Sequence, residues 1–147
     1  METYGTEGVT YEFANFIEQQ FALEKIEKDL LSPICQLWIA ENNQNPVGVI
    51  QVEYQKECPR GQIIAPEINK LYILRNFYGQ GIGQNLMRLA EEAIRSGGYN
   101  KLWLWVLESN MRAVKFYLQQ GFKNIGKADF KMQVNTYSNL VMLKNYD

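Results

Sequence analysis

The chain has 147 residues, of which 46% are hydrophobic and 21% are charged, and its formal net charge is −1. This length and balance are typical of one globular domain, and a charge so close to zero gives no general attraction to nucleic acid. No stretch is long and apolar enough to predict a membrane span, and the start of the chain lacks the basic and apolar runs of a secretion signal. We therefore expect one domain over residues 1–147, in the cytoplasm, with neither membrane nor nucleic-acid partners.

The sequence contains no histidine and only two cysteines. The lack of histidine excludes Ser–His–Asp and Cys–His catalysis, any imidazole base and the zinc sites that need imidazole. Cys35 and Cys58 are too few and too far apart for a disulfide framework or a thiolate metal site. Proton transfer must therefore use carboxylates, tyrosines, lysines, a thiol or water, and we expect no metal.

The first half of the chain contains helical and strand patterns in turn. Residues 10–31 have apolar positions at helical spacing and predict one or two amphipathic helices that end near Pro33. Residues 35–41 and 47–54 are strand-like runs with a polar turn between them, which predicts a hairpin. After a polar segment that contains two prolines, residues 67–74 predict a third strand.

The second half predicts two helices and three strands. Apolar residues from Gly81 to Gly97 fall on one face of a helix, and the almost continuously apolar residues 101–107 are typical of a strand covered on both faces. Residues 109–122 begin with helix-capping residue types and end at a glycine, as a second helix would. Two strands follow, at about 123–132 and 137–145, with their turn at VNTYS. This order predicts a mixed α/β sheet with one strand–helix–strand crossover.

Three glycines, Gly79, Gly81 and Gly83, separate the third strand from the helix that follows it. Glycine lets backbone amides approach a ligand closely, and the free amides and dipole of a helix start attract an anion. A P-loop is excluded, because the chain has no Lys-Ser or Lys-Thr pair. A dinucleotide fingerprint meets Gln84 in place of its third glycine, and too little chain follows Gly121 to complete such a sheet. Two interpretations remain: the loop amides hold a pyrophosphate, or the turn merely connects strand and helix.

The glycine turn and a later segment resemble the two acetyl-CoA motifs of the GNAT (Gcn5-related) N-acetyltransferase superfamily. The first motif, Gln/Arg-x-x-Gly-x-Gly/Ala, corresponds to YGQGIG, in which Tyr78 stands where the family has Gln or Arg. The second motif is Asn, two residues, Ala, two residues, Phe-Tyr, three residues and Gly-Phe. Its positions are matched by Asn110, Ala113, Phe116, Tyr117, Gly121 and Phe122. The resemblance covers roughly residues 34–145.

The resemblance implies the GNAT fold, an α/β (α+β) arrangement in which a mixed, mostly antiparallel sheet of about six strands is flanked by helices. Members of the family begin with a β-strand and the first part of a helix. This chain opens with METYGTEGVTYEF, which resembles the end of that helix, so we expect the N-terminal strand to be absent. The neighbouring strand would then be an exposed edge that can pair with a second copy of the chain, as a homodimer.

The resemblance also implies acetyl-CoA (coenzyme A) as the cofactor. The strand at residues 71–73 is expected to splay from its neighbour, so that its free amides bond the pantetheine and the thioester carbonyl. The amides of residues 78–84 are expected to cradle the pyrophosphate, and Asn110 to bond the pantetheine arm. The full cofactor-binding set is Leu71, Tyr72, Ile73, Tyr78, Gly79, Gln80, Gly81, Ile82, Gly83, Gln84, Asn110, Ala113, Phe116 and Tyr117.

In a mechanism like the family's, an amine attacks the thioester directly in a ternary complex, with no covalent acyl-enzyme. Such a reaction needs no activated nucleophile, so it is compatible with a chain that lacks histidine. Tyr117 resembles the family's general acid, and an ordinary core aromatic is the alternative role. Glu67 is the expected base, directly or through water, because it begins the strand that lines the thioester. A solvated strand-end carboxylate is the alternative for Glu67, and Glu53 and Glu108 are weaker choices of base.

The C-terminal half resembles a bacterial subgroup that includes polyamine acetyltransferases of the PaiA type. Those proteins carry an Asp where Asn139 aligns, and a Gly-Asp near Gln133 and Val134. An acceptor with several ammonium groups needs carboxylates near the cleft, so the loss of these acids weakens a polyamine assignment. The acceptor is left open among a small primary amine, a polyamine and a peptide N-terminus. A non-catalytic acyl-CoA-binding module with the same fold is the alternative function.

Overall fold

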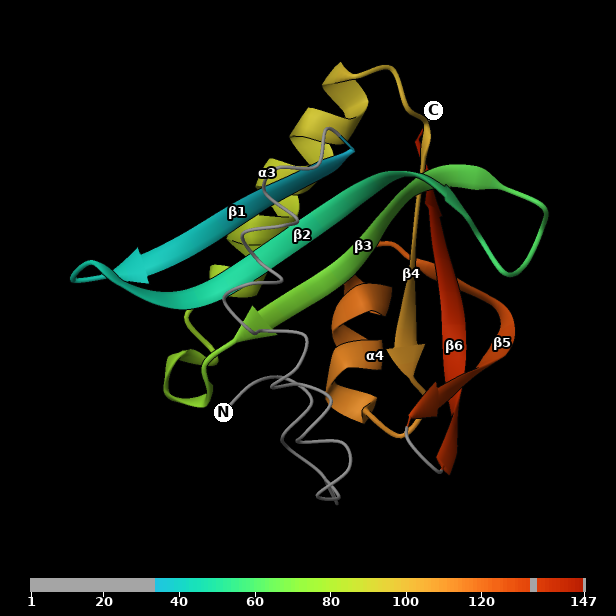
Figure 1. The fold of residues 1–147 in the computed structure, drawn as a ribbon. Helices are drawn as coiled ribbons and strands as arrows, with labels where there is room; N and C mark the ends of the chain where they lie inside the picture. The colour runs from blue at the N-terminus through green and yellow to red at the C-terminus, as the bar shows by residue number, and fades with distance from the viewer. Residues whose placement is uncertain (1–33, 133–134, 147) are drawn as a thin grey trace.

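The structure is a computed structural model that describes residues 34–132 and 135–146; the helices predicted within residues 10–31 lie outside this part. The described chain forms a six-stranded sheet of order β1-β2-β3-β4-β6-β5 with helices beside it, which confirms the predicted mixed sheet (Figure 1). The strands are β1 (Cys35–Asn42), β2 (Asn45–Glu57), β3 (Ile64–Ile73), β4 (Lys101–Leu107), β5 (Lys123–Met132) and β6 (Asn135–Asn145). The helices are the short 3-10 helix η2 (Arg75–Phe77) and the α-helices α3 (Ile82–Ser96) and α4 (Met111–Gln119).

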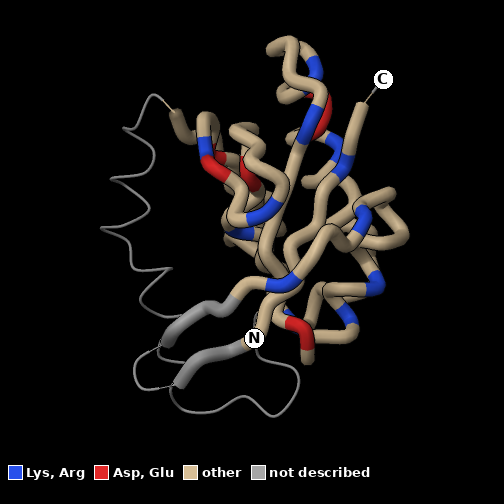
Figure 2. The backbone as a smooth tube through the Cα atoms, turned by 90° about the vertical axis from the view of Figure 1, so that its right-hand side faces the viewer, with Lys and Arg blue, Asp and Glu red and all other residues tan. Residues whose placement is uncertain are grey.

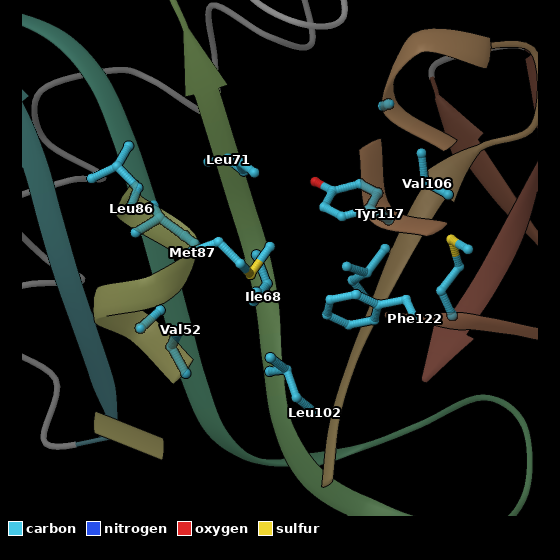
Figure 3. Packing of buried hydrophobic residues seen from close by; sticks show 14 of the residues in the cluster. Val52, Ile68, Leu71, Leu86, Met87, Leu102, Val106, Tyr117 and Phe122 are labelled. Carbon is cyan, nitrogen blue, oxygen red and sulfur yellow. The ribbon is translucent and has the colours of Figure 1, made fainter. Parts of the chain in front are cut away.

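Both α-helices pack on the same face of the sheet. The pair β3 and β4 is parallel, whereas the other pairs of neighbours in the described sheet are antiparallel, and α3 is the crossover within the parallel pair. Buried residues of α3 recur at helical spacing and meet residues of β2, β3 and β4 in one apolar cluster, which also includes Tyr117 of α4 (Figure 3). A second cluster, around Trp103, covers part of the opposite face. Such burial of large apolar side chains is the main stabilising contribution to the fold.

The strands β3 and β4 diverge at the centre of the sheet. They pair only at Glu67 with Trp103 and at Ile68 with Leu104, and Figure 1 shows α4 in the opening between them. Asn69 is an extra residue in β3, because the neighbours of Asn69 pair with adjacent residues of β2, Val52 and Gln51. A β-bulge of this kind bends its strand and increases the local twist. The splay predicted for residues 71–73 is therefore present, and the bulge at Asn69 accounts for it.

Of the strand boundaries that differ from the sequence prediction, the start of β3 and the start of β6 have a clear structural reason. Pro66 is predicted to lie outside a strand, yet β3 begins at Ile64. The β2–β3 register shifts beside Pro66, between Glu53 and Lys56 of β2, and such an irregularity accommodates a residue without an N–H. The turn predicted at VNTYS is also wrong, because β6 begins at Asn135 and its ladder with β5 runs to the end of that strand.

Candidate functional site

A cavity of about 480 Å³ lies where the glycine turn, β3 and α4 meet. It is lined by most of the predicted cofactor-binding residues, namely Leu71, Ile73, Tyr78, Gly79, Gly81, Ile82, Gly83, Gln84, Ala113, Phe116 and Tyr117. Gln80, Tyr72 and Asn110 do not line it. Side chains and amides alternate along a strand, so Tyr72 points to the other face and the three amides of residues 71–73 cannot all face the opening. The prediction that the amides of residues 71–73 all bond the cofactor is therefore wrong, because successive amides point to opposite sides of the strand.

Two of the three glycines give the turn its open shape. Gly79 and Gly81 have φ values of +78° and +79°, and a Cβ atom built on either would meet nothing within 4 Å. Other residues rarely adopt this left-handed conformation, so glycine is required by the backbone here. Gly83 has a different role, because its Cβ would lie 3.5 Å from the ring of Phe116 on α4. The turn therefore leaves free space beside its backbone and brings α3 close to α4.

The start of α3 opens on this cavity. Its N-cap is Gly81, no described side chain caps it, and its first turn contains no acidic residue. The first amides of an α-helix have no partner within the helix, and the helix dipole adds partial positive charge there. Together with the open glycine turn, these amides form a place suited to phosphate oxygens.

The charged residues that line the cavity are both cations. Arg112 and Lys115 of α4 belong to the lining, and no carboxylate of a described residue does. Elsewhere both signs of charge are distributed along the chain, as Figure 2 shows. The guanidinium carbon of Arg112 lies 3.6 Å from the ring centroid of Tyr78, a cation–π contact. A cation from α4 thus lies at the position where the family motif has Gln or Arg, and sequence reasoning missed it although Arg112 lies inside the second motif.

Asn110 lines a smaller cavity that lies between β3 and β4, together with Asn69 and Tyr117. It is the N-cap of α4, where its Oδ1 accepts a hydrogen bond from the N–H of Ala113 at 3.2 Å. The Nδ2 of Asn110 is buried and has no hydrogen-bond partner. An unsatisfied buried donor costs about 1–3 kcal/mol, so the site fits a ligand that brings a carbonyl group.

Tyr117 lies at the junction of the two cavities and lines both of them. Its ring is buried and makes edge contacts with Phe116 and Phe122, at centroid distances of 5.4 and 5.8 Å. These contacts fix the ring, and Figure 3 shows its hydroxyl oxygen directed across the opening toward Leu71 of β3. The phenol therefore reaches the opening from the face that carries α4.

Glu67 lies on the other face of the sheet, in the ladder where it pairs with Trp103, and it lines neither cavity. It follows the alternation of β3, so its side chain lies opposite that of Ile68, which belongs to the cluster under the helices. Burial raises the pKa of Glu67 to about 7, and the neighbouring carboxylate of Glu53 adds to this rise. The cations Lys56 and Lys70 oppose it. A carboxyl group with such a pKa exchanges its proton near neutral pH.

The two weaker choices of base are engaged in other contacts. Glu108 forms an ion pair with Lys127 at 2.8 Å, and the hydrogen bonds from Lys127 and Ser138 hold the pKa of Glu108 below its ordinary value. Glu53 accepts a hydrogen bond from Asn69 and pairs with Lys56. Among the described residues, no group of acids and cysteines could hold a metal ion, and no helix has the length and apolarity that crossing a membrane requires.

The model of the acetyltransferase (GNAT) family matches residues 4–122, which is most of the chain. An uncharacterized N-acetyltransferase encoded in the pepI 3′ region of Lactobacillus delbrueckii subsp. lactis is 22% identical over 146 residues, covering 97% of this chain and 83% of that protein. The aminoalkylphosphonate N-acetyltransferase of Salmonella typhimurium is 31% identical over 112 residues, covering 74% of this chain and 70% of that protein.

Among solved structures, the PaiA N-acetyltransferase from Thermoplasma acidophilum, in complex with coenzyme A, aligns with a TM-score of 0.75. The alignment covers 98% of this chain and 84% of that one at 22% sequence identity, and such a likeness shows the fold. The sheet, the two motifs and the family match agree with one another. The chain belongs to the GNAT family of acetyltransferases.

Proposed function

We propose that the chain is an N-acetyltransferase that moves an acetyl group from acetyl-CoA to a primary amine. The observation that carries this proposal is the cavity at the glycine turn, which combines open helix-start amides with two lining cations and leads to the orphaned Nδ2 of Asn110. A ligand with phosphates at one end and an amide-containing arm at the other matches that order of groups. The PaiA structure holds coenzyme A, which has this composition, and so supports the assignment.

Each part of the cavity has a role in holding the cofactor. Of the predicted cradle amides of residues 78–84, that of Tyr78 already donates to the carbonyl of Arg75 at 3.1 Å. The amides of residues 79–84 and the dipole of α3 bind the pyrophosphate, and Arg112 and Lys115 balance its negative charge. The Nδ2 of Asn110 donates a hydrogen bond to a carbonyl of the pantetheine arm. When bound, acetyl-CoA supplies a thioester whose carbonyl carbon an amine can attack.

Glu67 and Tyr117 are proposed to handle the protons of the reaction. Glu67, whose pKa of about 7 lets it ionise near neutrality, accepts a proton from the ammonium form of the acceptor, directly or through water. Tyr117 holds on its hydroxyl the proton that the leaving sulfur needs. The two groups lie on opposite faces of β3, which separates the entry of the amine from the exit of the thiol.

We assign a small primary amine as the acceptor class. The relative from Salmonella is named for aminoalkylphosphonates, which are small primary amines, and this supports the assignment. The likeness to PaiA keeps polyamines as the second class to test, and a peptide N-terminus is the third.

Calorimetric titration with acetyl-CoA, followed by thiol release with a panel of amines, tests the proposal. The panel comprises 2-aminoethylphosphonate, spermidine and a short peptide with a free N-terminus. Binding together with thiol release supports acetyl transfer, and the amine with the highest kcat/KM identifies the acceptor class. Binding with no release on any amine favours a non-catalytic acyl-CoA-binding module. A chain that does not bind acetyl-CoA refutes both functions.

A further inference from the structure

Asn69 occupies an unusual place in the sheet. It is the bulged residue of β3, at the point where β3 leaves β4, and it lines the smaller cavity between these two strands. Bulges next to active sites often re-aim a side chain. The proposed reaction gives Asn69 no role, and neither cofactor motif includes it.

The orientation of the Asn69 amide is fixed by Glu53. The Nδ2 of Asn69 donates to Oε1 of Glu53 at 3.0 Å, while Oε2 of Glu53 lies 3.2 Å from Nζ of Lys56. A carboxylate paired with a lysine offers only acceptors, so the nitrogen of the Asn69 amide has to face it. The Oδ1 of Asn69 is thereby turned away from Glu53, and it is buried with no hydrogen-bond partner.

The opposite wall of this cavity presents the complementary group. Because a backbone N–H can only donate, the bond from Ala113 fixes the position of Oδ1 of Asn110 and leaves Nδ2 as the end of the amide that remains to be bonded. Asn110 is only 5% exposed, and its Nδ2 has no partner. Buried polar groups in folded proteins nearly always have a hydrogen-bond partner. One orphaned acceptor and one orphaned donor thus belong to the walls of one cavity of about 20 Å³, which has room for a single polar group of a ligand that could bond to both.

We propose that Asn69 is a substrate-binding residue whose Oδ1 accepts a hydrogen bond from an N–H group of a substrate held between β3 and β4. The inference rests on the proposed acetyl transfer and adds a contact to it. Glu53 acts through Asn69 as a positioning residue, because it holds the amide with its oxygen toward the cavity.

Two N–H groups of the reaction have the required chemistry. Leu71, Ala113 and Tyr117 line both cavities, so the smaller one continues the cofactor cavity inward. A pantetheine amide of the cofactor and the attacking amine both arrive at this inner end. Both present an N–H to the same oxygen, and measurement of each substrate separately distinguishes them.

The variant Asn69→Leu, which keeps the size of the side chain without its polar atoms, tests the inference. Loss of one hydrogen bond is expected to weaken one substrate by about tenfold. A higher Kd for coenzyme A, measured by calorimetry, assigns the N–H to pantetheine. A higher KM for the amine with an unchanged Kd for coenzyme A assigns it to the attacking amine. Asn42→Leu, at the exposed end of β1, is the matched control and changes neither value.

Thermal unfolding without ligand separates binding from folding. Asn69→Leu is expected to unfold within a few degrees of the wild type, because the variant loses an orphaned acceptor and only one hydrogen bond. A fall of more than about 5 °C would show that the side chain serves the fold, and would overturn the inference. Unchanged Kd and KM values would also overturn it. Wild-type protein that does not bind coenzyme A refutes the proposed function itself, which is a different result.

Discussion

Tyr117 and Glu67 lie on opposite faces of the sheet, and Glu67 belongs to the short ladder beyond which β3 and β4 separate. Tyr117 comes from α4 and is held by its contacts with Phe116 and Phe122, whereas Glu67 belongs to β3 itself. In the proposed reaction a proton leaves the amine and another reaches the sulfur. Because the two groups lie on two faces, each can transfer its own proton without occupying the space that the other needs.

Removal of the Tyr117 hydroxyl tests the acid. Tyr117→Phe keeps the ring and its edge contacts, so we expect the affinity for acetyl-CoA to change little. The kcat should fall by about 100-fold, the usual contribution of a positioned general acid. Steady-state thiol release measures both values, and Tyr99→Phe, which changes a more exposed tyrosine after α3, is the control. An unchanged kcat would remove Tyr117 as the acid.

The raised pKa of Glu67 makes a prediction about pH. Between its ordinary value of 4.5 and about 7, the folded protein keeps a proton that the unfolded chain has lost, so the free energy of unfolding falls as pH rises through this window. Glu67→Gln removes this effect, and at pH 8 the variant should be more stable than the wild type by about 3 kcal/mol. At pH 4 the two should be equally stable. Urea unfolding at both pH values measures the difference.

The same substitution has a kinetic consequence. If Glu67 is the base, kcat/KM of the wild type rises as pH increases through about 7, because the ionised carboxylate is the active form. Glu67→Gln should lower kcat/KM and lose this rise. An identical pH profile in the variant would assign the base to another group or to water.

Arg112 is expected to contribute to cofactor affinity. Arg112→Ala removes a cation that lies over Tyr78 at the cavity, so the Kd for coenzyme A should rise by about tenfold, with a weaker dependence on salt. The control is Arg88→Ala, which removes an equally charged side chain paired with Glu92 on the exposed side of α3. Equal affinities for coenzyme A in the two variants would contradict the role of Arg112.

The proposed binding of phosphate by the glycine turn before α3 can be tested with two matched glycine substitutions. Gly81 and Gly98 share a left-handed backbone, with φ values of +79° and +87°, and open space where a Cβ atom would lie, but only Gly81 lines the cavity. Both substitutions to Glu strain the backbone by a similar amount, of about 1 kcal/mol. Gly81→Glu should also abolish coenzyme A binding, because it places bulk and negative charge at the pyrophosphate site, whereas Gly98→Glu should retain binding. Calorimetry on both variants decides whether the turn is the phosphate cradle.

Local patterns in the sequence predicted the elements that do not depend on distant partners. The continuously apolar run of β4 and the one-sided apolar pattern of α3 specify these elements with nearly their observed bounds. The inclusion of Pro66 in β3 did not follow from its neighbours, because it depends on the register shift against β2. The bulge at Asn69 and the contact of Arg112 with Tyr78 are likewise set by pairing and packing between segments far apart in the chain. Motif matching found the loop and α4, but not these contacts.

The whole sheet consists of two antiparallel halves joined by a short parallel ladder. The halves are β1-β2-β3 and β4-β6-β5, and two residue pairs connect β3 with β4. Beyond that ladder, α3 and the shared apolar cluster hold the halves together, as the side chains of Ile68 and Leu102 in Figure 3 illustrate. The ligand site therefore exists because the two halves of the sheet separate beyond the ladder.

Hydrogen exchange can measure the separation directly. The ladder between β3 and β4 does not extend to residues 70–73, so amides of this segment that point toward β4 should exchange faster than the amides of β2 in the free protein. Saturating coenzyme A should slow the exchange of these amides selectively and leave β5 nearly unchanged. If coenzyme A binds and the exchange of residues 70–73 is unaltered, the cofactor arm does not pair with β3.

The divergence of β3 and β4 also bears on self-association. Every open sheet has two outer edges, and this one has two further edges at its centre, along the separated parts of β3 and β4. Free strand edges invite other chains to add to them, and long exposed ones promote aggregation. Here the inner edges face each other above a core covered by α3 and α4, where a slender ligand can enter more easily than a folded strand. The inner edges of β3 and β4 can therefore bond to a ligand, while a strand of a second copy of the chain cannot readily pair with them.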